Sequence, residues 1–257
     1  MENSSKLVDN TGKFTGNYFQ WLKVQLTGWD TLPWALFGFA LGMQGMSFAL
    51  NPITWISVVS LIATLFGSLC TCAMMAAGID SITGKRVTSR AINGVLGAVS
   101  VIGFVIVNAT MGHWWSVLDQ LVFFVLIDVE LMFTWRTWGR GKNTEIKKLS
   151  NKGYGYATLA ILVAWLALYF VGVQLGDQQP VFDSLVLAIG AVASWLCFRR
   201  YSLTYKLWLL ADVAQIALFV ATMVQTGVTG ASMALALNYV FYLLTAIGGL
   251  INWKPTK

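Results

Sequence analysis

The sequence predicts an all-α integral membrane protein with eight transmembrane helices. Hydrophobic residues make up 57% of its 257 residues and charged residues only 11%, and the mean hydropathy is +0.67. Soluble domains contain about 25% charged residues, so this composition excludes the soluble classes. The apolar residues also fall into stretches long enough to cross a bilayer, and the basic residues lie between those stretches in alternate connections.

The eight predicted spans follow from the length of the apolar stretches. A membrane-crossing helix needs about 20 mainly apolar residues, or about 17 to 25 when tilt is allowed. The stretches that qualify are 31–50, 53–77, 92–110, 115–135, 154–175, 182–198, 206–226 and 232–252. Residues 1–30 hold charged residues among aromatics and no signal-peptide pattern, so they predict an interfacial N-terminal segment in the cytoplasm.

The basic residues orient the spans. All 17 Lys and Arg residues lie at 6–23, 85–90, 136–152, 199–206 and 254–257, which are the two terminal segments and every second connection. The remaining connections carry none of them. Because Lys and Arg accumulate in short cytoplasmic loops, this pattern predicts an even number of spans with both termini in the cytoplasm.

The charge and the cysteines exclude several classes of partner. The net charge of +6 is not arranged as a basic stripe on a soluble fold, so we expect the anionic face of the lipid bilayer and no nucleic acid as its partner. Cys70, Cys72 and Cys197 are too few for a disulfide framework or a four-ligand metal site, and His113 is the one histidine. We therefore predict no metal, no cofactor and no enzymatic activity.

An internal repeat is indicated when the chain is compared with itself at an offset of 118 residues. The stretch DQLVFFVLIDVELMFTW (119–135) aligns with LNYVFYLLTAIGGLINW (237–253), which pairs Gln120 with Asn238. Spans two to four and six to eight would then be parallel three-helix repeats, a plan known in transporters that bind substrate between the halves. The chance similarity of apolar helices is the alternative explanation.

Three motifs carry a resemblance to a known family. They are FDS at 182–184, RRYSLTYKLW at 199–208 and NYVFYLLTAIGGLINW at 238–253, to which Gln120 in an aromatic stretch is added. Together they resemble the PnuC-type vitamin transporters, most closely in the last third of the chain. Two positions depart from the family pattern, which has Trp where this chain has Tyr205 and Asn where it has Asp212.

The resemblance implies a three, one and three helix core similar to that of the SWEET sugar transporters. It divides the chain into an N-terminal segment (1–30), an extra helix (31–50), a first repeat (53–135), a basic loop (136–153), a linker helix (154–175) and a second repeat (182–253). It also implies uptake of nicotinamide riboside across a bacterial inner membrane by facilitated diffusion, with cytoplasmic phosphorylation trapping the vitamin. A homotrimer is implied as well.

Polar residues within the seventh span are the first site candidates. Trp208 and Asp212 are four residues apart and so share a helical face, and Gln215 lies on a neighbouring strip. An aromatic ring, a carboxylate and an amide suit a ligand with a cationic ring and hydroxyl groups. Alternatively, Trp208 lies in the interfacial belt and Asp212 pairs with a basic loop residue.

The other candidates lie in the third helix of each repeat. Asp128 and Glu130 diverge by about 200° on a helix, so we expect only Asp128 to line the pathway. Gln120 and Asn238 are expected at equivalent depths, although a bond between helices would also explain them. Tyr239, Tyr242 and Tyr205 are further candidates for contact with the substrate.

The residues leave two other functions open. If Asp212 or Asp128 binds protons or Na⁺, the chain would be an ion-coupled transporter of another vitamin or nucleoside, such as thiamin, riboflavin or a deoxynucleoside. A non-transporting membrane assembly protein is the third hypothesis, but it leaves the carboxylate of Asp212 without a role.

Overall fold

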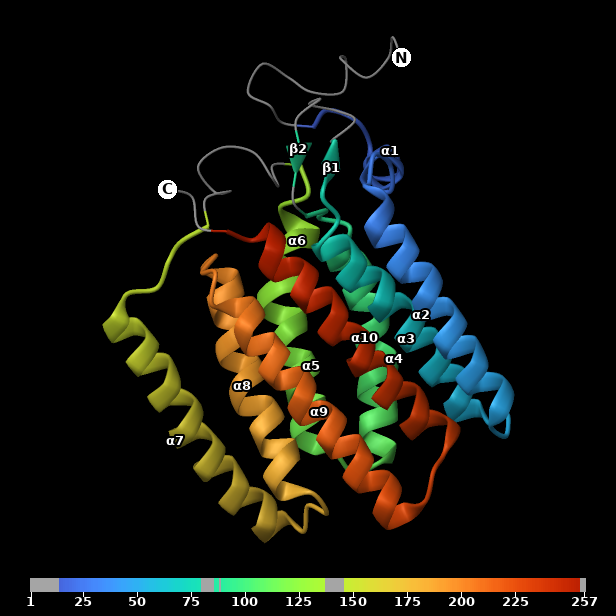
Figure 1. The fold of residues 1–257 in the computed structure, drawn as a ribbon, viewed down its shortest axis with the longest axis vertical. Coiled ribbons are helices and arrows are strands. Elements are labelled where there is room, and N and C mark those ends of the chain that lie inside the picture. The colour runs from blue at the N-terminus through green and yellow to red at the C-terminus, as the bar shows by residue number, and fades with distance from the viewer. Residues whose placement is uncertain (1–13, 80–85, 88, 137–145, 255–257) are drawn as a thin grey trace.

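The structure is a single bundle of helices. It is a computed structural model that describes residues 14–79, 86–87, 89–136 and 146–254. The long helices lie side by side, with α7 at one edge of the bundle and α2 at the other (Figure 1). The short antiparallel pair of β1 (Gly78–Ile79) and β2 (Arg86–Val87) lies at the same end as α1 and the C-terminal end of α10 (Figure 1).

Apart from the short α1, the helices coincide with the apolar stretches of the sequence. The helices are α1 (Tyr18–Gln25), α2 (Thr31–Leu50), α3 (Trp55–Met74), α4 (Asn93–Thr110), α5 (Trp114–Phe123), α6 (Val129–Phe133), α7 (Asn151–Leu175), α8 (Pro180–Phe198), α9 (Thr204–Thr226) and α10 (Gly230–Asn252). A π-helical turn, Phe124–Asp128, joins α5 to α6. The bounds agree with the eight predicted stretches to within three residues at each end.

Six of the described helices are long and apolar enough to cross a membrane: α3, α4, α7, α8, α9 and α10. The segment from α5 through the π-helical turn to α6 is continuously helical over 114–133, although neither α5 nor α6 alone is long enough to belong to this set. The helix α2, which contains the buried polar residues Gln44 and Ser47, is also outside the set. The all-α membrane class is therefore confirmed, whereas the count of eight stays a prediction.

Helix packing divides the bundle into two groups. Consecutive helices pack together within α3, α4 and α5, and again within α8, α9 and α10. Between the groups, α5 packs against α8 and α10 packs against α3, so the last helix of each group contacts the first helix of the other. The helix α2 packs against α3 and α10 from outside, and α7 packs against α8.

Local sequence explains several helix ends at the end of the bundle that lacks basic residues. Thr54 and Ser57 form a capping box at the start of α3, and Thr229 and Ser232 form the same arrangement at the start of α10. Gly176 closes α7 with a φ of 76°, a conformation that glycine adopts without steric cost. Pro180 then begins α8, where its missing amide hydrogen removes no helical bond.

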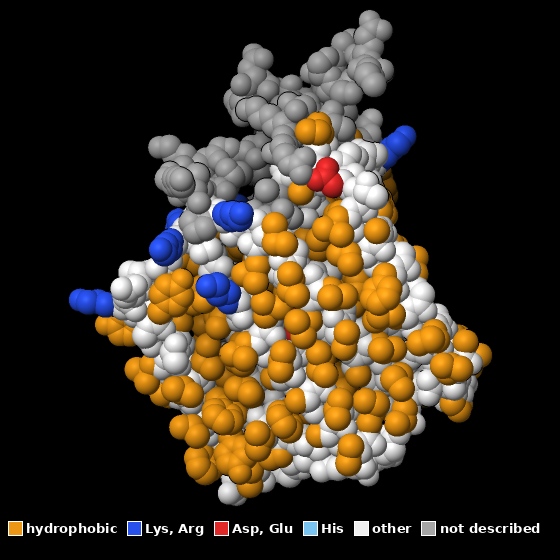
Figure 2. Space-filling model, in the orientation of Figure 1, with side chains coloured by type: hydrophobic (Ala, Val, Ile, Leu, Met, Phe, Trp, Pro, Cys, Tyr) orange, Lys and Arg blue, Asp and Glu red, His pale blue; other side chains and the backbone are white. Residues whose placement is uncertain are grey.

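The surface fits a lipid environment. Hydrophobic side chains cover the face drawn in Figure 2 along the length of the helices, and Lys and Arg side chains lie toward the end that contains the described chain ends. On α7, Leu159, Leu166 and Phe170 are each more than half exposed. Such an extended apolar surface is unfavourable in water and is expected of a helix that contacts lipid.

Candidate functional site

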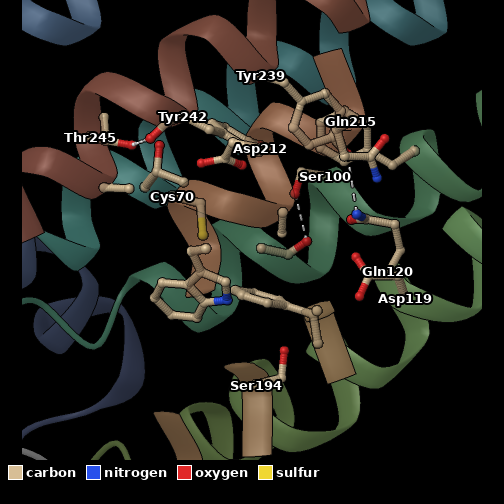
Figure 3. Close-up of a pocket in the computed structure, with 18 of the residues that line it drawn as sticks. Cys70, Ser100, Asp119, Gln120, Ser194, Asp212, Gln215, Tyr239, Tyr242 and Thr245 are labelled. Atoms are coloured by element: carbon tan, nitrogen blue, oxygen red, sulfur yellow. Dashed lines mark hydrogen bonds between the residues drawn. The ribbon is translucent and has the colours of Figure 1, made fainter. Parts of the chain in front are cut away.

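A cavity of about 110 Å³ lies between the two helix groups, with room for several water molecules. Side chains from α3, α4, α5, α8, α9 and α10 line it, and α2 and α7 contribute none. Its lining includes hydroxyl, amide, carboxyl and thiol side chains, and Figure 3 labels Cys70, Ser100, Asp119, Gln120, Ser194, Asp212, Gln215, Tyr239, Tyr242 and Thr245 among them. Among the residues that the structure describes, no Lys, Arg or His lines the cavity.

The predicted face of α9 borders this cavity. Trp208, Asp212 and Gln215 all line it. Asp212 is only 7% exposed and Gln215 only 2%, and neither the oxygen nor the nitrogen of the Gln215 amide has a hydrogen-bond partner in the described chain. A buried amide without partners costs free energy, so its two polar atoms are available to a ligand.

Trp208 belongs to an aromatic wall rather than to the lipid interface. Its ring lies 6.0 Å from that of Phe123 on α5 and 5.0 Å from that of Tyr205, measured between centroids. The Phe123 and Trp208 rings come from different helix groups and both line the cavity. They therefore place flat apolar surfaces from both groups within reach of one ligand.

Two tyrosines of α10, Tyr239 and Tyr242, also line the cavity. The Tyr239 and Tyr242 rings lie 5.4 Å apart in an edge-to-face arrangement, and the Gln120 amide donates a long hydrogen bond of 3.5 Å to the Tyr239 hydroxyl (Figure 3). That bond joins the first helix group to the second. Because it is long, it can yield to a bond with a ligand.

Tyr205 lies where the central cavity meets a second, smaller one. Tyr205 and Met74 line both cavities, and the second is also lined by Glu130 and Arg200. The Tyr205 ring packs edge-to-face against Trp208 and Trp253, with centroids 5.0 and 5.2 Å away. It also lies so close to Gly249 that a Cβ there would overlap it. Tyr205 thus separates the central cavity from the end of the bundle that carries the basic residues.

Asp128, expected to line the pathway, is not among the residues that line the cavity and lies behind Gly97, which is. Asp128 is fully buried and is absent from the cavity lining, and its carboxylate lies against Gly97 of α4, with no room for a Cβ there. The expectation assumed a regular α-helix through residue 128. The π-helical turn, which ends at Asp128, inserts an extra residue per turn and changes the direction in which the following side chains point.

Asn238 also lies elsewhere than expected. Its side-chain oxygen accepts a hydrogen bond of 3.1 Å from the Ser68 hydroxyl of α3, and it is not among the lining residues. Gln120 does line the cavity, so the two amides paired by the sequence repeat do not occupy equivalent places. Asn238 joins two helices instead, which is the alternative that its sequence position left open.

The sequence interpretation missed Asp119. This residue lines the cavity from α5, and its carboxylate lies against Gly190 of α8, with no room for a Cβ at that glycine. An aspartate within a predicted span is itself a signal for a site, since a charge in the membrane is costly. Within the described ranges, no three acidic, cysteine or histidine side chains are grouped so that they could hold a metal ion.

Polar contacts tie the helices together at the end opposite the basic residues. Asp183 of α8 accepts hydrogen bonds from the backbone amides of Trp115 and Ser116, at 3.0 and 2.8 Å. His113, just before α5, is 1% exposed, and its Nε2 lies 3.0 Å from the Thr222 hydroxyl of α9. Burial lowers the pKa of His113 to about 4, so the imidazole is neutral at pH 7.

Comparison with known proteins gives consistent matches over most of the chain. Residues 57–255 match the sequence profile of a family described as nicotinamide mononucleotide transporter. The chain is 25% identical over 239 residues to the nicotinamide riboside transporter PnuC of Neisseria mucosa, covering 91% of this chain and 84% of the relative. It is also similar to a crystal structure of the vitamin B3 transporter PnuC, with a TM-score of 0.72 and 24% identity over 93% of this chain and 97% of that one.

Proposed function

Because the chain belongs to the nicotinamide mononucleotide transporter family, we propose that it takes up nicotinamide riboside across a bacterial inner membrane. The observation that carries this proposal is the cavity between the two helix groups, which combines an aromatic wall, two carboxyl groups and a buried amide that, among the described residues, has no hydrogen-bond partner and no basic neighbour in the lining. The relative from Neisseria mucosa, which is named as a nicotinamide riboside transporter, supports the choice of substrate.

The chemistry of the cavity fits the parts of this substrate. Its pyridinium ring is flat and carries a positive charge, so it can stack on Trp208 while the carboxylate of Asp212 offsets the charge. Gln215 and Gln120 offer amide donors and acceptors to the ribose hydroxyls and the carboxamide, and Tyr239 and Tyr242 offer hydroxyl groups. Tyr205 closes the cavity toward the basic end of the bundle.

We further propose the complete membrane topology. It has eight spans: the extra helix 31–50, a first repeat within 53–135, the linker 154–175 and a second repeat within 182–253. The reciprocal packing of α5 on α8 and of α10 on α3 supports two parallel repeats related by an axis along the membrane normal. The exposed, apolar α7 suits the linker.

Orientation and assembly belong to the same proposal. The basic residues support a cytoplasmic location for the N-terminal segment 1–30, the loop 136–153 and the C-terminus. The family resemblance implies that the chain assembles as a homotrimer. Asn238 then serves to join helices rather than to bind substrate, Asp128 lies behind Gly97 of the cavity lining, and Asp119 joins the site.

Transport in this proposal follows the concentration gradient of the vitamin. The sequence has no Gly-x-x-x-x-Gly-Lys-Ser/Thr loop that would bind ATP. Phosphorylation of the vitamin by a cytoplasmic enzyme would keep its free concentration low inside and so maintain the inward flux. The two helix groups would move against each other around the cavity, which opens alternately to either side.

Uptake by purified protein in liposomes tests the proposal. We expect saturable uptake of radiolabelled nicotinamide riboside that excess unlabelled substrate abolishes. Trp208→Leu should reduce the uptake at least tenfold, because the stacking surface is lost. Trp195→Leu is the matched control, since Trp195 is half exposed on α8 and lies outside the lining of the central cavity. Uptake equal to that of empty liposomes would refute the proposal.

A further inference from the structure

A groove between α7 and α8 lies apart from the two cavities described above and shares no lining residue with them. Its volume is about 560 Å³, which lies within the range of about 300 to 1,000 Å³ that is usual for ligand sites. Because α7 forms one edge of the bundle (Figure 1), a molecule that enters this groove comes from the surrounding membrane rather than from the central cavity.

Small and aliphatic side chains leave the space that forms the groove. Gly153, Ala157 and Ala160 line it from α7 at helical spacing. On α8 the lining runs from Ala191 to Arg199, which is about 12 Å at the helical rise of 1.5 Å per residue. One leaflet is half of the hydrocarbon core of about 30 Å. The groove therefore has the apolar chemistry and the length to hold much of an acyl chain of one leaflet.

Hydrogen bonds hold α7 against the second helix group at both ends of the groove. At the basic end, the Lys147 amide donates to the Arg200 carbonyl at 2.8 Å, and the Ser202 amide donates to the Lys147 carbonyl at 2.9 Å. Toward the other end, the Trp165 indole donates to the Val181 carbonyl at 3.0 Å. The space between these bonds is therefore a fixed feature of the fold.

The basic end of the groove is positively charged. Arg199 lines the groove, and among the described residues no Asp or Glu does. Lys148 and Lys152 are exposed and directly precede Leu149 and Gly153, which both line it. Lys and Arg side chains also gather toward this end of the molecule in Figure 2. An anionic group at this end of the groove would find positive charge and guanidinium donors.

We propose that the groove binds an anionic phospholipid of the cytoplasmic leaflet. Its phosphate accepts hydrogen bonds from the Arg199 guanidinium, and one acyl chain lies between α7 and α8 along Ala157 and Ala160. Basic pockets between transmembrane helices on the cytoplasmic side are known to bind such headgroups. The site does not depend on which substrate is transported, and the proposed orientation serves only to name the leaflet.

A bound lipid would contribute contacts that α7 otherwise lacks. All residues of α7 are described, and of these only Gly172 is buried. A lipid in the groove would contact α7 and α8 together, so it would fasten the helix to the second helix group. Because the site exists only in the folded chain, such binding also stabilises the fold by mass action.

Native mass spectrometry of the purified protein in detergent tests the proposal. The protein is titrated with palmitoyl-oleoyl phosphatidylglycerol and, separately, with phosphatidylcholine that carries the same chains. We expect one phosphatidylglycerol per chain to bind at least about fivefold more tightly than phosphatidylcholine, since each basic residue near an anionic headgroup contributes about this factor.

Two variants test the two parts of the site. Arg199→Gln should weaken phosphatidylglycerol binding about fivefold, and Lys206→Gln is its control, because Lys206 is exposed at the same end but does not line the groove. Ala160→Trp should weaken the same binding because the indole fills the apolar part. Thr158→Trp is its control, at an exposed position of α7 outside the lining. Arg199 and Ala160 are both exposed, so we expect both variants to fold.

Equal affinity for the two lipids overturns the proposal, and so does either variant that binds phosphatidylglycerol as tightly as its control. The same spectra record the oligomeric state. If Ala160→Trp separates an oligomer into single chains and leaves lipid binding unchanged, the groove is a contact between copies of this chain and the proposal fails. None of these outcomes bears on the binding of nicotinamide riboside, so failure here leaves the proposed function standing.

Discussion

Asp183 of α8 caps the N-terminus of α5 and thereby joins the two helix groups. Its carboxylate accepts from the Ser116 amide at 2.8 Å, from the Trp115 amide and from the Ser116 hydroxyl. Both Asp183 and Ser116 are fully buried. The first amides of a helix have no partner within the helix, and a carboxylate there also interacts favourably with the helix dipole.

We predict that Asp183→Ala destabilises the protein because it leaves two buried amides unsatisfied. The cost should be about 1 to 3 kcal/mol, and about 2–4 °C of melting temperature is lost per kcal/mol in a chain of this size. Thermal unfolding in detergent measures it. Asp177→Ala is the control, because Asp177 caps only the Gln179 amide in a partly exposed loop. Equal shifts for both variants would contradict the role of Asp183.

A second prediction concerns pH. The folded pKa of His113 is lowered to about 4 from 6.5 by burial, so the unfolded chain binds a proton between these values that the folded chain does not. His113 therefore has little effect on the free energy of unfolding above pH 6.5, and that free energy falls as the pH drops toward 4. At pH 5 the loss attributable to His113 should be about 2 kcal/mol.

The variant His113→Gln provides the comparison for this effect, because its amide does not titrate but can still reach Thr222. Melting temperatures are measured for both proteins at pH 7 and pH 5. Other carboxyl groups also titrate in this range, so the difference between the two proteins is the informative quantity. If both proteins lose the same number of degrees, His113 does not retain its neutral form as the structure implies.

A third prediction follows from the contact between Gly190 and Asp119. An alanine Cβ at position 190 would overlap the Asp119 carboxylate, so Gly190→Ala should move that carboxylate and weaken substrate binding about tenfold, or about 1.4 kcal/mol. Gly42→Ala on α2 is the matched control, since no atom lies within 4 Å of a Cβ there. Unchanged affinity in Gly190→Ala would show that Asp119 is not needed at its present place.

The proposed orientation gives a fourth prediction. In a chain whose three cysteines are replaced by alanine, Gln178→Cys and Lys148→Cys each place one thiol at an exposed position on opposite ends of the bundle. A membrane-impermeant maleimide added to intact cells should label position 178 and reach position 148 only after the membrane is disrupted. The reverse pattern of labelling would place the termini outside the cytoplasm.

The positions of the long helices were predictable because the length of an apolar stretch alone determines where a chain can cross a membrane. A segment that crosses lipid must be apolar over about 20 residues, so the bounds of α2, for example, coincide with the predicted stretch 31–50. The hairpin of β1 and β2 and the short helix α1 were not predicted, since polar segments outside the bilayer are not subject to that constraint.

The site was only partly predictable, because helical spacing gives the correct face only where the helix is regular. Trp208, Asp212 and Gln215 lie on the regular helix α9, and all three line the cavity. Asp128 lies at the end of a π-helical turn, which no feature of the sequence indicated, and it is not among the residues that line the cavity. Asp119 was visible as an acid within a span, but its importance depends on contact with Gly190 of another helix group.

The central claim is that this cavity binds nicotinamide riboside. Calorimetric titration of the purified protein with nicotinamide riboside, thiamin, riboflavin and deoxynucleosides tests it most directly, with Trp208→Leu and Trp195→Leu measured in parallel. We predict saturable binding of nicotinamide riboside at one site per chain, weakened at least tenfold by Trp208→Leu and unchanged by Trp195→Leu. Binding of another of these compounds in its place, or of none of them, would contradict the account.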